Sequence, residues 1–146
     1  MKQLKEVMTQ DIQVIHPNAS LKEVAIKMKE LNCGAMPVCE NDKLLGMVTD
    51  RDIVIRTLAD NRDPNTTYAK EVMSSPIIYF FEDQEIDEAA RLMEVKKIRR
   101  LVILNRKKRL VGIVSLGDLA VRTGSGELSG EILGKVSEPY NPQQAA

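Results

Sequence analysis

The sequence has no tryptophan, one histidine, two cysteines and no net charge. With 21 basic and 21 acidic residues, it has no basic excess that would attract a nucleic acid. No apolar run approaches the ~20 residues of a membrane-spanning helix, and Met1–Glu6 lacks the apolar core of a signal peptide. We therefore expect a cytoplasmic protein that binds neither nucleic acid nor membranes.

The scarcity of histidine and cysteine also argues against catalysis and metal binding. Cys33 and Cys39 form a C-x5-C pair with a spacing unlike that of metal ligands, so we expect both to be reduced and structural. His16 precedes Pro17 in a predicted turn, far along the chain from any nucleophile. No glycine-rich phosphate loop is present. These absences predict a protein without catalytic residues, metal or cofactor, and therefore not an enzyme.

The chain does contain an internal repeat. Val7-Met8-Thr9 recurs as Val72-Met73-Ser74 at an offset of 65, and Leu44–Thr49 recurs as Leu110–Ser115 at an offset of 66. The two copies therefore differ by one inserted residue at a turn. Repetition of this kind indicates a tandem duplication, in which two small units share their buried surface.

Each copy has the pattern of an α+β (α/β) unit with the order β-α-β-β-α. Its first helix is predicted from apolar spacing i, i+3, i+4, i+7, and polar turns separate the two later strands. In the first copy Ser20 and Glu23 have the spacing of a capping box. The predicted segments are 12–15, 21–31, 35–39, 44–49 and 50–58 in the first copy, and 77–80, 86–96, 100–104, 110–115 and 116–122 in the second.

The domain boundaries follow from the repeat. We predict a first domain at residues 1–62, a second at 63–123, packed as a pseudo-symmetric pair, and a tail at 124–146 that is partly helical or disordered. The helices carry more apolar positions than one buried face needs, which favours a homodimer. These positions are Val24, Ile26, Met28, Leu31, Leu92, Met93 and Val95.

The repeated motifs resemble those of CBS domains, and the pair resembles a Bateman module. The matching pieces cover about residues 4–122, and their doubled occurrence in the same order is more specific than any one of them. The first matching pieces are Val7-Met8-Thr9 and Val72-Met73-Ser74, which begin the two copies. The others are Gly34-Ala35-Met36-Pro37-Val38 with Arg99-Arg100-Leu101-Val102-Ile103, and Gly46-Met47-Val48-Thr49-Asp50-Arg51-Asp52 with Gly112-Ile113-Val114-Ser115-Leu116-Gly117-Asp118.

The resemblance implies a sensor that binds an adenine nucleotide, such as AMP, ADP or ATP, in clefts between paired domains. It implies that Asp52 and Asp118 bind ribose, and that Thr49 and Ser115 lie near the ribose and phosphate. It places Arg99 and Arg100 at the phosphate. The adenine would be held near Val14-Ile15 and Ile78-Tyr79 by backbone groups and apolar side chains.

The residues themselves leave two interpretations open for these motifs. Thr49 and Ser115 each end an apolar strand and begin a helix, where unpaired backbone N–H groups favour an anion. Two arginines on a neighbouring strand can hold phosphate in bidentate fashion. However, Thr49-x-x-Asp52 and Ser115-x-x-Asp118 are also variants of the helix capping box, with a purely structural role. Strand alternation further predicts that only one of the two arginines faces solvent.

The two clefts are predicted to differ, because Gly34 and Ala35 stand where the second copy has Arg99 and Arg100. A phosphorylated ligand should therefore prefer the second copy's residues. Two rival functions remain open: a ligand-free module that only mediates assembly, and a sensor of another adenosyl ligand such as S-adenosylmethionine. In each case an effector protein, which the sequence does not identify, would read the signal.

Overall fold

The structure is a computed structural model that describes residues 2–74 and 77–122. Its contacts divide the chain into two compact units, and neither is a continuous stretch of sequence. Of the described residues, 11–74, 77–78 and 107–110 form one unit, here the first-copy unit, and 2–10, 79–106 and 111–122 form the other, the second-copy unit. The predicted tail after residue 123 lies outside the described residues.

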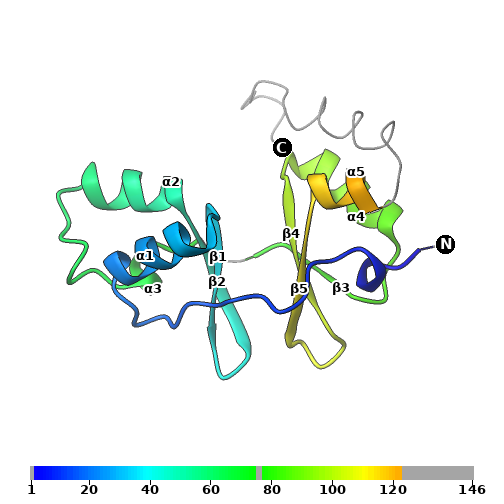
Figure 1. Cartoon of the computed structure of the whole chain (residues 1–146), viewed down its shortest axis with the longest axis horizontal. Helices are drawn as coiled ribbons and strands as arrows, with labels where there is room; N and C mark the ends of the chain where they lie inside the picture. The colour runs from blue at the N-terminus through cyan, green and yellow to red at the C-terminus, as the bar shows by residue number, and fades with distance from the viewer. Residues whose placement is uncertain (1, 75–76, 123–146) are drawn as a thin grey trace. The chain divides into compact units, whose positions relative to one another are not determined.

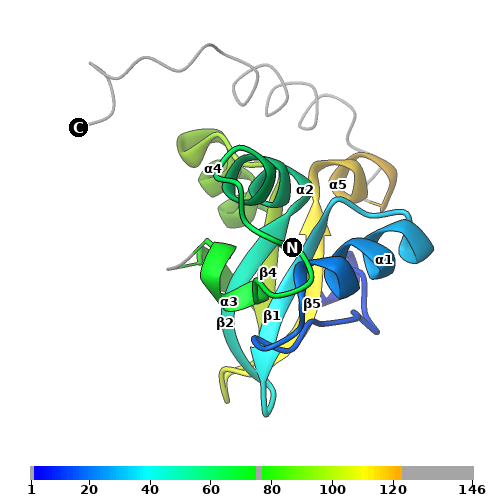
Figure 2. The same ribbon diagram turned by 90° about the vertical axis from the view of Figure 1, so that its left-hand side faces the viewer.

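The first-copy unit packs helices against a β-hairpin, with α1 and α3 on the same face of the two strands (Figures 1 and 2). The hairpin turns at Asn41 and Asp42, whose φ angles of 52° and 64° match a two-residue type I′ turn. Its elements, in chain order, are α1 (Leu21–Leu31), β1 (Ala35–Glu40), β2 (Lys43–Thr49), α2 (Asp50–Ile53), the π-helical turn η2 (Val54–Leu58) and α3 (Ala69–Val72).

The second-copy unit repeats this plan with a complete third strand. Its sheet has the order β3-β4-β5, in which β3 runs parallel to β4. The four residues that follow Arg100 in β4 are all buried, so this strand is covered on both faces. Its elements are η1 (Leu4–Glu6), β3 (Tyr79–Phe81), α4 (Ile86–Lys96), β4 (Arg100–Leu104), β5 (Leu110–Ser115) and α5 (Leu116–Arg122).

The opening segment of each copy packs into the core of the other unit. Leu4, Val7 and Met8 belong to the second-copy core, whereas Ala69 and Val72 belong to the first-copy core. Each segment also extends the local sheet by one antiparallel bridge, Thr9 with Ile113 and Ser74 with Met47. The other members of the second-copy core are Ile86, Ala89, Ala90, Met93, Leu101, Ile103, Val114 and Leu119. Those of the first-copy core are Ile15, Leu21, Val24, Met28, Met36, Val38 and Val48.

The two long helices begin and end where the sequence predicts. Leu21, Val24 and Met28 form the buried face of α1, and Ser20 Oγ caps it by accepting the Glu23 N–H at 3.2 Å. This bond is one half of the predicted capping box. Both α1 and α4 end in the left-handed conformation, at Asn32 (φ 52°) and Lys97 (φ 55°), a common helix terminator.

Three details differ from the sequence prediction. The segment 12–15 forms no strand and makes only a bridge from Ile15 to Val38. The helix predicted over 50–58 changes from α to π geometry at Val54. Of the apolar positions expected to be surplus, Val24, Met28 and Met93 are buried in the cores, because they lie on the single buried face of α1 or α4.

Candidate functional site

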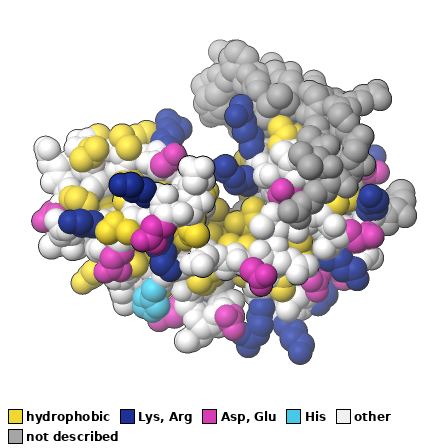
Figure 3. Space-filling view, in the orientation of Figure 1, with side chains coloured by type: hydrophobic (Ala, Val, Ile, Leu, Met, Phe, Trp, Pro, Cys, Tyr) yellow, Lys and Arg dark blue, Asp and Glu magenta, His cyan; other side chains and the backbone are white. Residues whose placement is uncertain are grey.

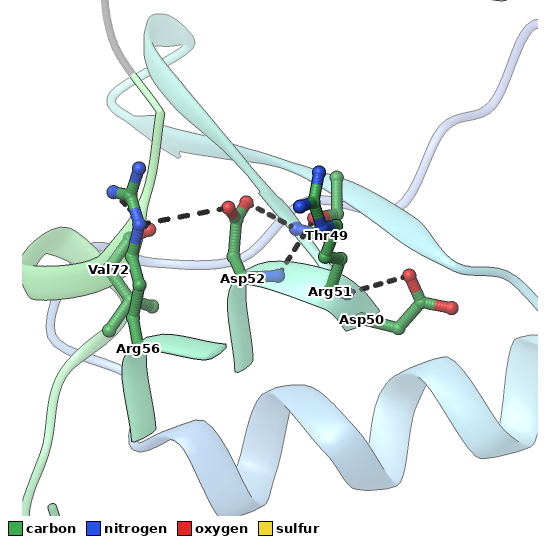
Figure 4. A network of polar contacts seen from close by, with 6 residues as sticks. All are labelled: Thr49, Asp50, Arg51, Asp52, Arg56 and Val72. Carbon is green, nitrogen blue, oxygen red and sulfur yellow. Dashed lines mark hydrogen bonds and ion pairs between the residues drawn. The ribbon is translucent and has the colours of Figure 1, made fainter. Parts of the chain in front are cut away.

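The Thr49–Asp52 motif forms a complete capping box at the start of α2. Thr49 Oγ1 accepts the Asp52 N–H at 3.1 Å, and Asp52 Oδ2 accepts the Thr49 N–H at 3.0 Å (Figure 4). The other carboxylate oxygen, Oδ1, lies 4.0 Å from Arg56 Nε, and the Asp52 side chain is 14% exposed. Arg56 also donates to the Val72 carbonyl at 3.2 Å.

The Ser115–Asp118 motif repeats this arrangement at the start of α5. Asp118 Oδ2 accepts the Ser115 N–H at 2.9 Å, and Ser115 Oγ accepts the Asp118 N–H at 3.0 Å. The capping interpretation is therefore confirmed in both copies. It does not exclude a ligand, because an ionised carboxylate offers about four acceptor positions and each cap uses one.

Arg99 and Arg100 are both exposed, contrary to the expected alternation. The reason is that Arg99 lies in a bend before β4 rather than in the strand, so alternation does not apply to it. The Arg99 carbonyl accepts the Leu116 N–H at 2.9 Å, which places this residue beside the Ser115–Asp118 turn. The backbone of a basic residue therefore lies beside the capped carboxylate, and an equivalent hydrogen bond is present in both units.

In the first-copy unit, β1 has no basic side chain at the corresponding position. Ala35 pairs with Thr49 in the β1–β2 ladder, and the Gly34 carbonyl accepts the Asp50 N–H at 2.9 Å. Asp50 is exposed and occupies the place that Leu116 has in the second copy. Sequence reasoning assigned no role to Asp50, although the change from leucine to aspartate between the copies was visible.

The four residues expected near adenine differ in exposure. Ile15 is 3% exposed and belongs to the first-copy core, whereas Val14, Ile78 and Tyr79 are 37–38% exposed. Ile15 bridges Val38 just as Phe80 pairs with Ile103, so Val14 corresponds to Tyr79. The Tyr79 ring meets Phe81 edge-on, with centroids 5.6 Å apart. Each copy thus has an exposed apolar residue directly before one that packs on the core, buried Ile15 in the first copy and partly buried Phe80 in the second.

The basic turn between β4 and β5 serves the fold. Arg106 makes a two-pronged ion pair with Asp83 at 2.8 and 2.9 Å, and its guanidinium lies 4.2 Å from the centre of the Phe81 ring. The hydrogen bond from Arg106 holds the pKa of Asp83 below its usual value. Arg109 pairs with Asp42 at 2.9 Å. Arg106 and Arg109 therefore stabilise the turn through ion pairs, a role different from the one expected for Arg99 and Arg100.

Thiol and metal chemistry find little support in the described part of the chain. Cys33 and Cys39 are free thiols, and burial, with a smaller contribution from Asp42, raises the pKa of Cys39 to about 11. Such a thiol is a poor nucleophile near neutral pH. Residues 2–74 and 77–122 contain no group of three or more His, Cys, Asp or Glu that could hold a metal ion. Over the same residues, no helix has the length and apolar character that crossing a membrane requires.

The geometry described above is that of a duplicated domain, and comparison with known proteins identifies its family. The chain matches the CBS domain family twice, at residues 4–58 and 69–122. The CBS domain-containing protein YhcV of Bacillus subtilis (strain 168) is 42% identical over 137 residues, which cover 94% of this chain and 96% of YhcV. The chain therefore belongs to the CBS domain family and is a tandem CBS pair, a regulatory module.

Two solved structures resemble this fold. The crystal structure of Hypoxic Response Protein I with two coordinated zinc ions is 37% identical, with a TM-score of 0.75 over 82% of this chain and 98% of that one. The CBS domain pair of protein MJ0100, in complex with 5′-methylthioadenosine and S-adenosyl-L-methionine, is 26% identical. Its TM-score is 0.74 over 86% of this chain and 98% of that pair.

Proposed function

We propose that this CBS pair is a sensor that binds an adenine nucleotide without turning it over. The observation that carries the proposal is the presence of two equivalent carboxylates, Asp52 and Asp118, each capping its helix through one oxygen. Carboxylate oxygens accept the hydrogen bonds that vicinal ribose hydroxyls donate. The similar MJ0100 pair holds two adenosyl compounds, which supports the nucleoside part of the proposal.

The phosphate part of the proposal rests on Arg99 and Arg100. Both side chains are exposed, and the Arg99 backbone is hydrogen-bonded to the turn that holds Ser115 and Asp118. Guanidinium groups bind phosphate oxygens through paired N–H donors. We therefore propose AMP, ADP or ATP as the ligand class, with the phosphate beside these arginines and the Ser115 hydroxyl within reach of the ribose and phosphate.

Adenine would lie near the exposed apolar residue Val14 in the first copy, or near Ile78 and Tyr79 in the second. Ile15 bonds β1 through its N–H, to Pro37, and through its carbonyl, to Cys39. Successive residues of an extended chain alternate in direction, so the polar backbone groups of Val14 point away from β1. They are suited to hydrogen-bond the edge of a base, while the Ile15 side chain supports the segment from the core.

Calorimetric titration with AMP, ADP, ATP and adenosine tests this proposal. Thermal shift provides a second readout, because a ligand of the folded state adds RT ln(1 + [L]/Kd) to stability. We expect saturable binding of at least one nucleotide, with adenosine weaker than AMP. If none of the four compounds binds or raises the melting temperature, the nucleotide proposal fails.

A second candidate, a module that mediates assembly without a ligand, is favoured by exposed apolar side chains on the first-copy unit. Hydrophobic side chains are exposed over α2 and η2 (Figure 3), and those of η2 are Val54, Ile55 and Leu58, at 53, 44 and 67% exposure. Contiguous apolar surface of this kind commonly marks an interface. We propose that it joins two copies of the chain in a homodimer, with or without a nucleotide. An unidentified effector protein would then read the state of the pair.

A further inference from the structure

Two backbone hydrogen bonds establish which residues correspond between the copies beside the proposed phosphate. The Asp50 N–H donates to the Gly34 carbonyl at 2.9 Å, and the Leu116 N–H donates to the Arg99 carbonyl at 2.9 Å. Asp50 and Leu116 each follow the hydroxyl residue of a capping box. The pair Gly34 and Asp50 in one unit is therefore equivalent to the pair Arg99 and Leu116 in the other.

The side chains at these equivalent positions carry opposite charge, a carboxylate at Asp50 in one copy and a guanidinium at Arg99 in the other. A Cβ atom built on Gly34 would lie 2.9 Å from Asp50 Oδ2, so a side chain at position 34 would require the exposed carboxylate to shift. Asp50 Oδ1 accepts the Arg51 N–H at 2.8 Å, which orients the carboxylate (Figure 4). In the second copy a leucine takes this place, and residue 99 carries a guanidinium.

The neighbouring charges do not cancel this difference. Two basic residues accompany Asp50 and Asp52, but Arg56 is committed to Asp52 and to the Val72 carbonyl. The other, Arg51, is exposed and lies on the same turn as Asp50. The residues around the Thr49–Asp52 turn, here called the first-copy half-site, therefore include two acidic side chains and two basic ones. The residues around the Ser115–Asp118 turn are the second-copy half-site. The corresponding residues of the second copy are two arginines, Arg99 and Arg100, and one carboxylate, Asp118.

From this difference in charge between the two copies we infer that Asp50 is a specificity-determining residue that keeps phosphate groups out of the first-copy half-site. A fixed carboxylate repels a phosphate dianion, because like charges at close range destabilise each other. The same carboxylate favours an adenosyl ligand whose 5′ substituent is neutral or cationic, such as a sulfonium. One chain would then distinguish two adenosyl classes, a phosphorylated one at the Arg99 half-site and a non-phosphorylated one at the Asp50 half-site. This inference rests on the proposed function.

The first test is Asp50→Asn, which keeps shape and removes charge. Calorimetric titration should show that AMP binding at the weak half-site improves by about tenfold, whereas S-adenosylmethionine binding falls by a similar factor. Adenosine, which carries no charge, should change little. Asp60→Asn, at an exposed position in the segment between the copies, is the matched control and should alter none of these affinities.

The second test exchanges the equivalent pairs. The double variant Gly34→Arg with Asp50→Leu should add a second AMP site per chain, and Arg99→Gly with Leu116→Asp should remove the first while adenosine still binds. If wild type binds AMP at one site and neither Asp50→Asn nor the exchange alters site number or the preference between AMP and S-adenosylmethionine, the inference is wrong and the proposed function stands. If wild type binds none of these compounds, both fall together. Because Asp50→Asn is conservative, the result does not depend on the exchanged variants folding.

Discussion

The sulfur of Met8 lies directly over Gly112, so closely that a Cβ atom on that glycine would be 2.5 Å from it. Met73 stands in the same relation to Gly46 in the other unit, at 2.6 Å. Each glycine therefore provides the space in which the opening segment of the other copy packs against the sheet. The glycine that begins each of the repeated motifs 46–52 and 112–118 is thus explained by packing, independently of any ligand.

We expect Gly112→Ala and Gly46→Ala each to lower the free energy of unfolding by about 1–3 kcal/mol, because the added methyl group overpacks a core. Gly117→Ala is the control, since its Cβ would meet only Ser115 Oγ at an ordinary 3.6 Å. Alanine is also a better helix former than glycine, so Gly117→Ala should be neutral or stabilising. Denaturant titration measures all three. Equal stabilities for Gly112→Ala and Gly117→Ala would contradict the close packing of Met8.

Two buried threonines in the first-copy unit offer a matched pair. Thr57, in η2, is 1% exposed and its hydroxyl has no partner among the described residues, whereas Thr67 donates to the Asp63 carbonyl at 2.8 Å. A buried polar group without a hydrogen bond costs about 1–3 kcal/mol. Thr57→Val should therefore stabilise the protein and Thr67→Val should destabilise it, as judged by melting temperature. Destabilisation by both would indicate that Thr57 has a partner, such as a bound water molecule.

Replacement of Asp118 by asparagine separates ribose binding from helix capping. Asparagine still offers an oxygen to the Ser115 N–H, so the melting temperature should change little. It has lost the charge and gained a donor where the ribose needs an acceptor. Nucleotide affinity should therefore fall by about 1.5–3 kcal/mol in calorimetric titration. Unchanged affinity would mean that Asp118 only caps, and Asp87→Asn, on the exposed side of α4, controls for charge.

The arginines should act on the phosphate and not on the nucleoside. We expect Arg100→Ala and Arg99→Ala to weaken AMP by about tenfold to a hundredfold, while adenosine loses much less. The preference for AMP should shrink with added salt, since exposed charges are screened over ~10 Å at 0.1 M. Arg91→Ala, on the exposed surface of α4, should have no effect. Equal losses for AMP and adenosine would show that the phosphate lies elsewhere.

The apolar surface on η2 predicts the state of assembly. Light scattering should return the mass of a homodimer for the wild-type chain and a monomer for Leu58→Glu, because a buried unpaired charge disfavours an interface. Val95→Glu changes another exposed apolar residue, 73% exposed on α4, and should leave the dimer intact. A dimer that resists Leu58→Glu but is lost with Val95→Glu would move the interface to α4. A monomer mass for the wild-type chain would contradict the predicted homodimer.

Local patterns predicted most elements of the fold. The i, i+3, i+4, i+7 spacing placed α1 and α4 at their observed bounds, and apolar runs between polar turns placed β4 and β5. Hydrophobic periodicity reports which residues are buried, but not which segment covers them. For that reason the packing of Leu4 and Val7 on the second copy, and of Ala69 and Val72 on the first, was not predicted.

The sequence identified the local motifs of the candidate site more reliably than it identified which of their residues lie side by side. The spacing of Thr49 and Asp52 identified a capping box, because that bond pattern is local. The proximity of Gly34 to Asp50 depends on the pairing of β1 with β2, which brings residues 16 positions apart into contact. Arg99 was expected to alternate with Arg100, and only the bend before β4 shows why both reach solvent.

The exchange of opening segments also constrains the order in which the protein matures. On a ribosome, which adds roughly 5–20 residues each second, Leu4, Val7 and Met8 emerge first but meet Val114 and Leu119 only near the end of the described chain. The first-copy core is complete once Val72 has emerged, so it can close earlier. Part of the apolar surface that covers the N-terminal segment is supplied by α4 and β4, and the rest only when β5 and α5 have emerged. Burial of the opening segment of the first copy therefore waits until most of the second copy has been translated.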